Sequence, residues 1–192
     1  MVKLSHNTMA CPADHEFLWI QDMDGSTLKR LKRKFKYLVQ TGPFLEEVLL
    51  CLLSKKPLSS LSAEQKVLTK LVRDALVNDP YGIARVAAVF SSRNMEDDIK
   101  ELEDTIATLH STHLSITDSE QVVLILTVLY MILVTRGHNL TAMAVTTGHM
   151  LASEYLQYHM QWLLDTGGLQ GLIRREHWTL YLKYRLRDIL CL

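Results

Sequence analysis

The sequence predicts an all-α protein, a globule of seven to nine helices built around one central apolar helix. Residues 122–134 form an uncharged, almost wholly apolar run of 13 residues. A helix that is apolar on every side lies either at the centre of a globule or in a membrane. Because the run is shorter than the ~20 residues that span a bilayer, we expect a central helix at about 118–135. The small numbers of proline (4) and glycine (8) are typical of a chain dominated by helices.

The composition indicates one globular domain without a strong charge bias. The chain has 192 residues, of which 48% are hydrophobic, enough for one substantial core. Lys plus Arg and Asp plus Glu number 21 each, so the net charge does not favour nucleic acid as a partner. Residues 1–25 show no sustained helical period, so we expect a loosely ordered N-terminal arm and a helical domain at 26–192. Three widely spaced cysteines and no secretory signal pattern predict a cytoplasmic location.

The first expected helix is basic and amphipathic. It begins at Ser26 or Thr27, runs to about Gln40, and is expected to stop at Gly42–Pro43. Its apolar face carries five residues at helical spacing: Leu28, Leu31, Phe35, Leu38 and Val39. Its other positions carry six cations: Lys29, Arg30, Lys32, Arg33, Lys34 and Lys36. Such a helix is typical of a contact with an anionic membrane, a nuclear-import signal or an acidic partner, and also of the solvated face of a packed helix.

Further helices follow from periodicity and capping residues. Ser62 with Gln65 forms a capping-box pattern ahead of an apolar stripe that ends before Pro80. The last segment is expected to be amphipathic, and its charged residues exclude a transmembrane tail. The expected helices are 44–54, 62–78, 82–90, 95–109, the central helix starting at Thr117 or Asp118, one from about Asn139 to Gly167–Gly168, and 176–192 with Trp178, Leu182, Leu186 and Ile189.

No feature of the sequence predicts an enzyme, a cofactor or a metal site. Gly-rich phosphate loops, GxSxG and HExxH motifs and cysteine nucleophile signatures are all absent. His110 and His113 lie three residues apart, and Cys11 lies close in sequence to His6 and His15. Neither set supplies the four well-placed ligands of a closed zinc site. We therefore expect a binding role rather than catalysis.

One motif is specific. Residues 162–173 read Trp-Leu-Leu-Asp-Thr-Gly-Gly-Leu followed, after a gap of two, by a final apolar pair. This pattern resembles the second homology motif of the Bcl family of apoptosis regulators, in which glycine ends one helix and a short second helix turns across the bottom of the fold. The motif residues are Trp162, Asp165, Gly167, Gly168 and Leu169. The resemblance implies a Bcl-like fold over about 26–190, most similar to the divergent members found in gammaherpesviruses.

The other family motifs are missing or altered. The first motif, centred on Asn-Trp-Gly-Arg, should fall near 118–122, where neither the tryptophan nor the arginine is present. The segment 137–140 keeps Gly-x-Asn but also lacks the arginine, and it leaves too little chain before Trp162 for a complete helix. The third motif should lie on 67–78, which keeps the apolar stripe without Leu-x-x-x-Gly-Asp. We therefore do not expect the chain to act as a strong donor of that motif.

The resemblance implies a regulator of apoptosis, in this case a viral modulator of host cell death. Its partners would be pro-apoptotic members of the family, each inserting an amphipathic helix (the death-motif helix) into a hydrophobic groove. By analogy the groove and partner-binding residues are Val72, Ala75, Phe90, Leu102, Ile106, Leu109, Glu120 and Gln121. In the family an arginine pairs with an aspartate of the incoming helix, a role for which Gln121 offers only a neutral hydrogen bond.

An alternative function rests on the basic helix at 28–39. It would make the protein a membrane-surface or nuclear accessory protein. Peripheral contact with mitochondrial or other membranes is compatible with both functions, as is a homodimer. Nothing in the sequence selects between survival and death as the outcome of binding.

Overall fold

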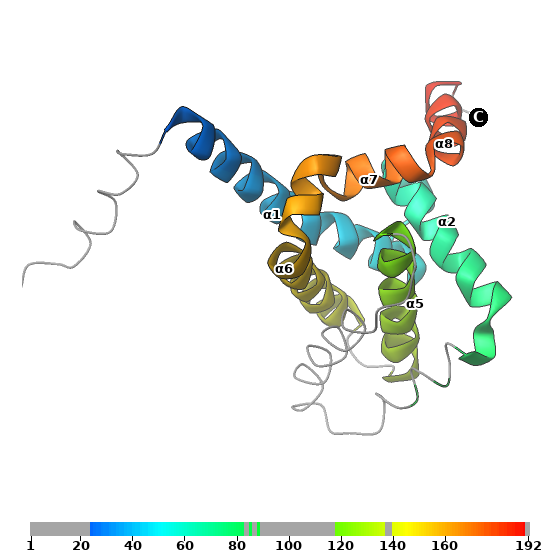
Figure 1. Cartoon of the computed structure of the whole chain (residues 1–192). Helices are drawn as coiled ribbons and strands as arrows, with labels where there is room; N and C mark the ends of the chain where they lie inside the picture. Colours follow the sequence, from blue (N-terminus) through cyan, green and yellow to red (C-terminus); the bar gives the residue numbers. More distant parts are fainter. Residues whose placement is uncertain (1–23, 83–84, 86–87, 89–117, 137–139, 191–192) are drawn as a thin grey trace, which may run out of the picture.

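The part of the chain that the computed structural model describes, residues 24–82, 85, 88, 118–136 and 140–190, is mostly helical and contains no strand. Residues 80–82 are helical and begin the helix expected at 82–90, whose remainder lies mostly outside the described residues, as does all of 95–109. This architecture confirms the predicted all-α class. The elements are α1 (Gly25–Leu52), the 3-10 turn η3 (Leu58–Ser60), α2 (Ala63–Asn78), α5 (Asp118–Arg136), α6 (Leu140–Thr166), α7 (Gly168–Glu176) and α8 (Trp178–Leu190) (Figure 1).

Helix α5 is the central helix, as predicted. Leu126, Leu129 and Leu133 have no exposed surface, and Ile125 and Ile132 are at most 2% exposed. Residues 118–135 are long and apolar enough to cross a membrane by composition alone, with a mean hydropathy of 1.6. In this structure the apolar positions of α5 instead form the middle of the core.

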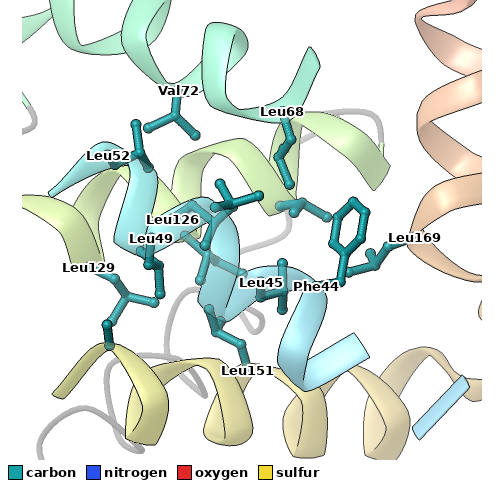
Figure 2. Close-up of a cluster of buried hydrophobic side chains, with 14 of the residues drawn as sticks. Phe44, Leu45, Leu49, Leu52, Leu68, Val72, Leu126, Leu129, Leu151 and Leu169 are labelled. Atoms are coloured by element: carbon teal, nitrogen blue, oxygen red, sulfur yellow. The ribbon is translucent and has the colours of Figure 1, made fainter. Parts of the chain in front are cut away.

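The core joins side chains from five helices into one cluster (Figure 2). Leu49 of α1 and Leu126 of α5 are both fully buried within it. Helix α2 adds Leu68, α6 adds Leu151 and α7 adds Leu169, each no more than 3% exposed. Helices α1, α2, α6 and α7 therefore contribute with α5 to the same hydrophobic interior, the main source of stability for a domain of this size.

The expected break at Gly42–Pro43 is wrong, because α1 continues through both residues. Pro43 has no N–H for the carbonyl of Val39, and a proline inside a helix ordinarily costs about 3 kcal/mol. Packing offsets that cost. Phe44 is almost fully buried, and Gly42 lies against α6, where a Cβ on the facing Gly148 would come 3.1 Å from the Gly42 carbonyl oxygen. The two small residues let α1 and α6 approach closely at this crossing.

The capping box at the start of α2 is confirmed, and it also ties α2 to α1. The Gln65 backbone N–H donates to Ser62 Oγ at 3.3 Å, and the Ser62 N–H donates to Gln65 Oε1 at 2.9 Å. Gln65 Nε2 donates in turn to the Phe44 carbonyl and to Glu47 Oε2, at 3.2 and 2.7 Å. Because Gln65 is 4% exposed, each of its polar atoms needs such a partner.

Candidate partner-binding surface

The glycine pair of the second-motif segment ends α6 as predicted. Gly167 has φ +80° and Gly168 has φ +79°, a left-handed backbone that strongly favours glycine. Gly168 is also sterically required, because a Cβ there would lie 2.9 Å from a ring carbon of Tyr37 on α1. The turn therefore redirects the chain from α6 into α7 while it is held against α1.

Helix α7 folds back onto the end of α6 at a third glycine. A Cβ on Gly171 would lie 1.7 Å from the carbonyl oxygen of Thr166, which no ordinary adjustment could accommodate. This contact seats Leu169, Leu172 and Ile173 in the core, each no more than 3% exposed. The Gly167–Gly168 break was predictable from the sequence, whereas this close approach at Gly171 was not.

The junction of α7 and α8 caps the start of the central helix. The Ser119 backbone N–H donates to Glu176 Oε2 at 3.3 Å, and Ser119 Oγ lies 3.0 Å from His177 Nε2. A carboxylate at a helix N-terminus favourably meets unpaired N–H groups and the positive end of the helix dipole. Burial raises the pKa of Glu176, but hydrogen bonds from Ser119 and Arg175 outweigh that effect, so the pKa is lowered. The α7–α8 junction and the start of α5 are thus directly bonded.

Glu176→Gln should destabilise the fold by about 0.5–1 kcal/mol at pH 7, because the amide keeps an acceptor but loses the charge at the α5 N-terminus. A carboxyl whose pKa is lowered on folding contributes stability above its unfolded pKa and loses that contribution as the pH falls through the folded value. The gap between wild type and variant should therefore close on acidification below about pH 4. Denaturant unfolding at several pH values measures this gap. An equal gap at pH 3 and pH 7 would contradict the assignment.

Two buried charges of α2 are neutralised by α7 and α8. Glu64 is 5% exposed and accepts from Arg174 Nε at 2.5 Å; the Arg174 guanidinium also lies 5.6 Å from the centre of the Tyr181 ring. Lys66, 7% exposed, pairs with Asp188 near the end of α8. Removing one partner of such a pair would leave a buried charge uncompensated. These contacts fix the orientation of α7 and α8 on α2.

The structure describes the side chains of four of the eight predicted groove residues. Val72 is fully buried and faces the core beside Leu52, so it presents no surface to a partner (Figure 2). Ala75 is half-buried on α2, Gln121 is half-buried at the start of α5, and Glu120 beside it is exposed. Four of the predicted residues lie outside the described part of the chain: Phe90, Leu102, Ile106 and Leu109.

Helix α8 exposes an apolar face that its sequence pattern did not reveal. Trp178 is 59% exposed and Leu186 is 55% exposed, on the stripe that also carries Leu182 and Ile189. The opposite side of α8, including Tyr184, packs partly against the core. Trp178 directly follows His177, whose ring contacts Ser119, so it stands close to the start of α5. An exposed tryptophan one residue after this contact extends the candidate surface.

The remaining predicted residues are spread over other regions. Asp165 is exposed near the end of α6, and Trp162 lies in α6 with its side chain outside the described part of the structure. The six cations of the basic helix all lie on the first half of α1, away from the α5–α7–α8 junction (Figure 1). They are exposed, apart from Lys34, which is half-buried.

Comparison with known proteins identifies the fold. No protein-family model matches the chain, and no curated protein has significant sequence similarity to it. Among solved structures, the chain matches a zebrafish pro-survival protein, NRZ, in a complex with the Bad BH3. The TM-score is 0.63 at 19% identity, and the match covers 76% of this chain and 97% of NRZ. With a central apolar helix, a glycine-ended α6 and a short α7 beneath it, this chain has a Bcl-2-like helical fold.

Proposed function

We propose that this protein is a Bcl-like regulator of apoptosis that binds the death-motif helix of a pro-apoptotic protein in a hydrophobic groove. The observation that carries the proposal is the likeness of the fold to NRZ, a structure solved with the Bad BH3. The geometry of the second-motif segment supports it, because the segment turns sharply at Gly167 and Gly168 into α7, and Glu176 at the end of α7 accepts a hydrogen bond from Ser119 at the start of α5. Fold alone does not determine function, so the described surface must also suit a helical ligand.

The start of α5 and the α7–α8 junction offer a surface of suitable chemistry. A helix bound in a groove needs apolar contacts spaced about one turn apart and a few polar groups that set its register. Trp178 supplies a large exposed apolar contact directly after His177, which contacts Ser119, and the polar residues Glu120 and Gln121 follow Ser119 on α5. Tryptophan is enriched among residues that dominate binding energy at protein interfaces. The hydrogen bonds from Ser119 to Glu176 and His177 hold the two parts of this surface together.

Gln121 stands where the family has an arginine, and this difference should lower the affinity for a death-motif helix. A charge-assisted hydrogen bond is roughly twice as strong as a neutral one. Gln121 would meet the aspartate of an incoming helix without charge, and the exposed carboxylate of Glu120 beside it would repel that aspartate. We expect binding that is weaker than that of an arginine-bearing relative and that depends more on apolar contacts such as Trp178.

Gln121→Arg should strengthen binding of the Bad BH3 peptide by about tenfold, from a new charge-assisted pair worth about 1.5 kcal/mol. The gain should vanish when the peptide aspartate is changed to alanine, and a double-mutant cycle by calorimetry or fluorescence anisotropy measures that coupling. Thr135→Arg is the matched control, because Thr135 is exposed near the far end of the same helix.

Two results would overturn the proposal or its register. Absence of binding by wild type and Gln121→Arg at high micromolar peptide concentration would argue against a functional groove. Tightening by Thr135→Arg equal to that by Gln121→Arg would show a general charge effect instead of a pair at the groove. Trp178→Ala, at an exposed site, should weaken binding without loss of stability if the α8 face contacts the ligand.

The finer assignment is a viral modulator of host cell death acting in the cytoplasm. It rests on the resemblance of the chain to the divergent members of the family found in gammaherpesviruses. Binding of a host death-motif peptide such as that of Bad is the property that this role requires. A panel of host death-motif peptides tests this role. A viral modulator of host cell death should bind at least one of them with an affinity that depends on Gln121.

A further inference from the structure

The first half of α1 extends away from the other helices (Figure 1). None of the described side chains from Asp24 to Gln40 is buried, whereas Thr41, Phe44 and Leu45 are. Tyr37, near the middle of α1, contacts the body of the fold, where its ring lies against Gly168. At a rise of 1.5 Å per residue, the twelve residues 25–36 project by about 18 Å. This projecting segment is the basic helix of the sequence.

The apolar face of this projection does not continue the core face of α1. Phe35 is 65% exposed and Val39 is 68% exposed. On a helical projection of about 100° per residue, the stripe that contains Leu28, Phe35 and Val39 is turned roughly a third of a turn away from the stripe that contains Leu45 and Val48. Arg30 and Lys34 occupy the side that does continue the core face. The projection therefore presents its apolar stripe to solvent.

The charge of the projection is wholly positive. Residues 25–45 contain six cations and no acidic residue. Asp24, just before them, accepts hydrogen bonds from the Ser26 and Thr27 N–H groups at 2.7 and 2.9 Å and serves as the helix cap. Cations near a helix N-terminus oppose the helix dipole, and like charges four residues apart, such as Lys32 and Lys36, repel each other. This charge pattern weakens the isolated helix. A negatively charged surface bound to the projection would offset that repulsion.

We propose that the projecting half of α1 docks the protein onto the surface of a membrane rich in anionic phospholipid. In this arrangement the helix lies in the plane of the interface, with Phe35 and Val39 inserted at the boundary between headgroups and acyl chains. Lys32 and Lys36 border one side of the apolar stripe and are exposed, so their long side chains can reach lipid phosphates. An exposed apolar stripe bordered by these cations complements the membrane surface in charge and in polarity. The docking role is independent of the groove and would add a location to the proposed binding function.

Co-sedimentation of the full chain with phosphatidylcholine vesicles, with and without phosphatidylserine, tests the proposal. Binding should require phosphatidylserine and weaken as salt is raised. Lys32→Gln combined with Lys36→Gln should lower the partition coefficient about 30-fold. Phe35→Ser combined with Val39→Ser should lower it by about tenfold or more at unchanged charge. All four positions are exposed, so circular dichroism and thermal unfolding should remain as in the wild type.

Lys183→Gln combined with Arg185→Gln is the matched control, because it removes two exposed cations beside the apolar stripe of α8 and should change partitioning less than twofold. A larger loss in that control than in the α1 variants would place the contact on α8 and overturn the proposal. Loss of binding in the lysine variant alone, with Phe35→Ser/Val39→Ser unaffected, would show electrostatic attraction without insertion and would equally exclude this mode. Bad BH3 affinity in solution should be the same for both α1 variants, which separates this proposal from the groove.

Discussion

Replacing Gly171 by alanine should destabilise the protein by at least about 3 kcal/mol, at or beyond the upper end of the range for overpacking. The added methyl carbon would lie only 1.7 Å from the Thr166 carbonyl oxygen and would therefore overlap with it. Relief requires α7 to move away from the end of α6, which lifts Leu169 and Leu172 from the core. It also moves Glu176, so the bonds from the α7–α8 junction to Ser119 should weaken. For a chain of 192 residues such a loss lowers Tm by about 6–12 °C.

The other glycines provide graded controls for this experiment. Gly25→Ala should leave stability unchanged or slightly raised, because a Cβ there meets nothing within 4 Å and alanine favours helix. Gly167→Ala should cost about 1–2 kcal/mol from its positive φ alone, since its nearest neighbours are 3.9 Å away. A Gly171→Ala loss no greater than that of Gly167→Ala, measured by denaturant unfolding, would contradict the close contact.

These glycines show how far local sequence rules reach. The left-handed turn at Gly167–Gly168 was predictable because a helix end followed by a glycine pair is a local signal. The capping box of Ser62 and Gln65 and the long apolar run of α5 were predictable for the same reason. Gly171 differs, because its requirement comes from Thr166 across the turn and no spacing rule identifies it.

The errors in prediction arose where tertiary packing decides the outcome. Gly42–Pro43 is a strong local stop signal, yet α1 passes through it because Phe44 and the residues after it are buried and Gly42 packs on α6. Likewise, an amphipathic pattern does not predict whether the apolar face of a helix packs against the core or is exposed to solvent. Phe35 on α1 and Leu186 on α8 were expected on apolar faces, and both faces are open to solvent.

The candidate site was predictable only in outline. The motif at 162–173 indicated where the chain turns, and the first-motif position indicated Gln121. The bonds at the start of α5 join Ser119 to Glu176 and His177, which lie 57 and 58 residues after Ser119 in the sequence. None of these three residues belongs to a recognisable motif. Their hydrogen bonds between α5 and the α7–α8 junction could therefore be identified only from the structure.

Leu129→Ala should cost about 2–5 kcal/mol, the range for truncating a buried leucine, because Leu129 has no exposed surface and is surrounded by residues of the core cluster (Figure 2). The same chemical change at Leu186, which is 55% exposed, is the matched control and should cost under about 0.5–1 kcal/mol. Both variants are compared with wild type by denaturant unfolding in aqueous buffer.

The comparison distinguishes two arrangements of α5. Residues 118–135 have the hydropathy of a membrane span, and in a membrane-inserted state Leu129 would face lipid or another helix instead of this core. If α5 is the core helix in water, the stability lost on replacing leucine by alanine must depend on burial. The loss should be large at Leu129 and small at Leu186. Equal small losses would show that α5 does not hold the aqueous fold together. If the chain binds the Bad BH3 peptide as proposed, Leu129→Ala should weaken that binding only in proportion to the unfolded fraction, because Leu129 has no exposed surface.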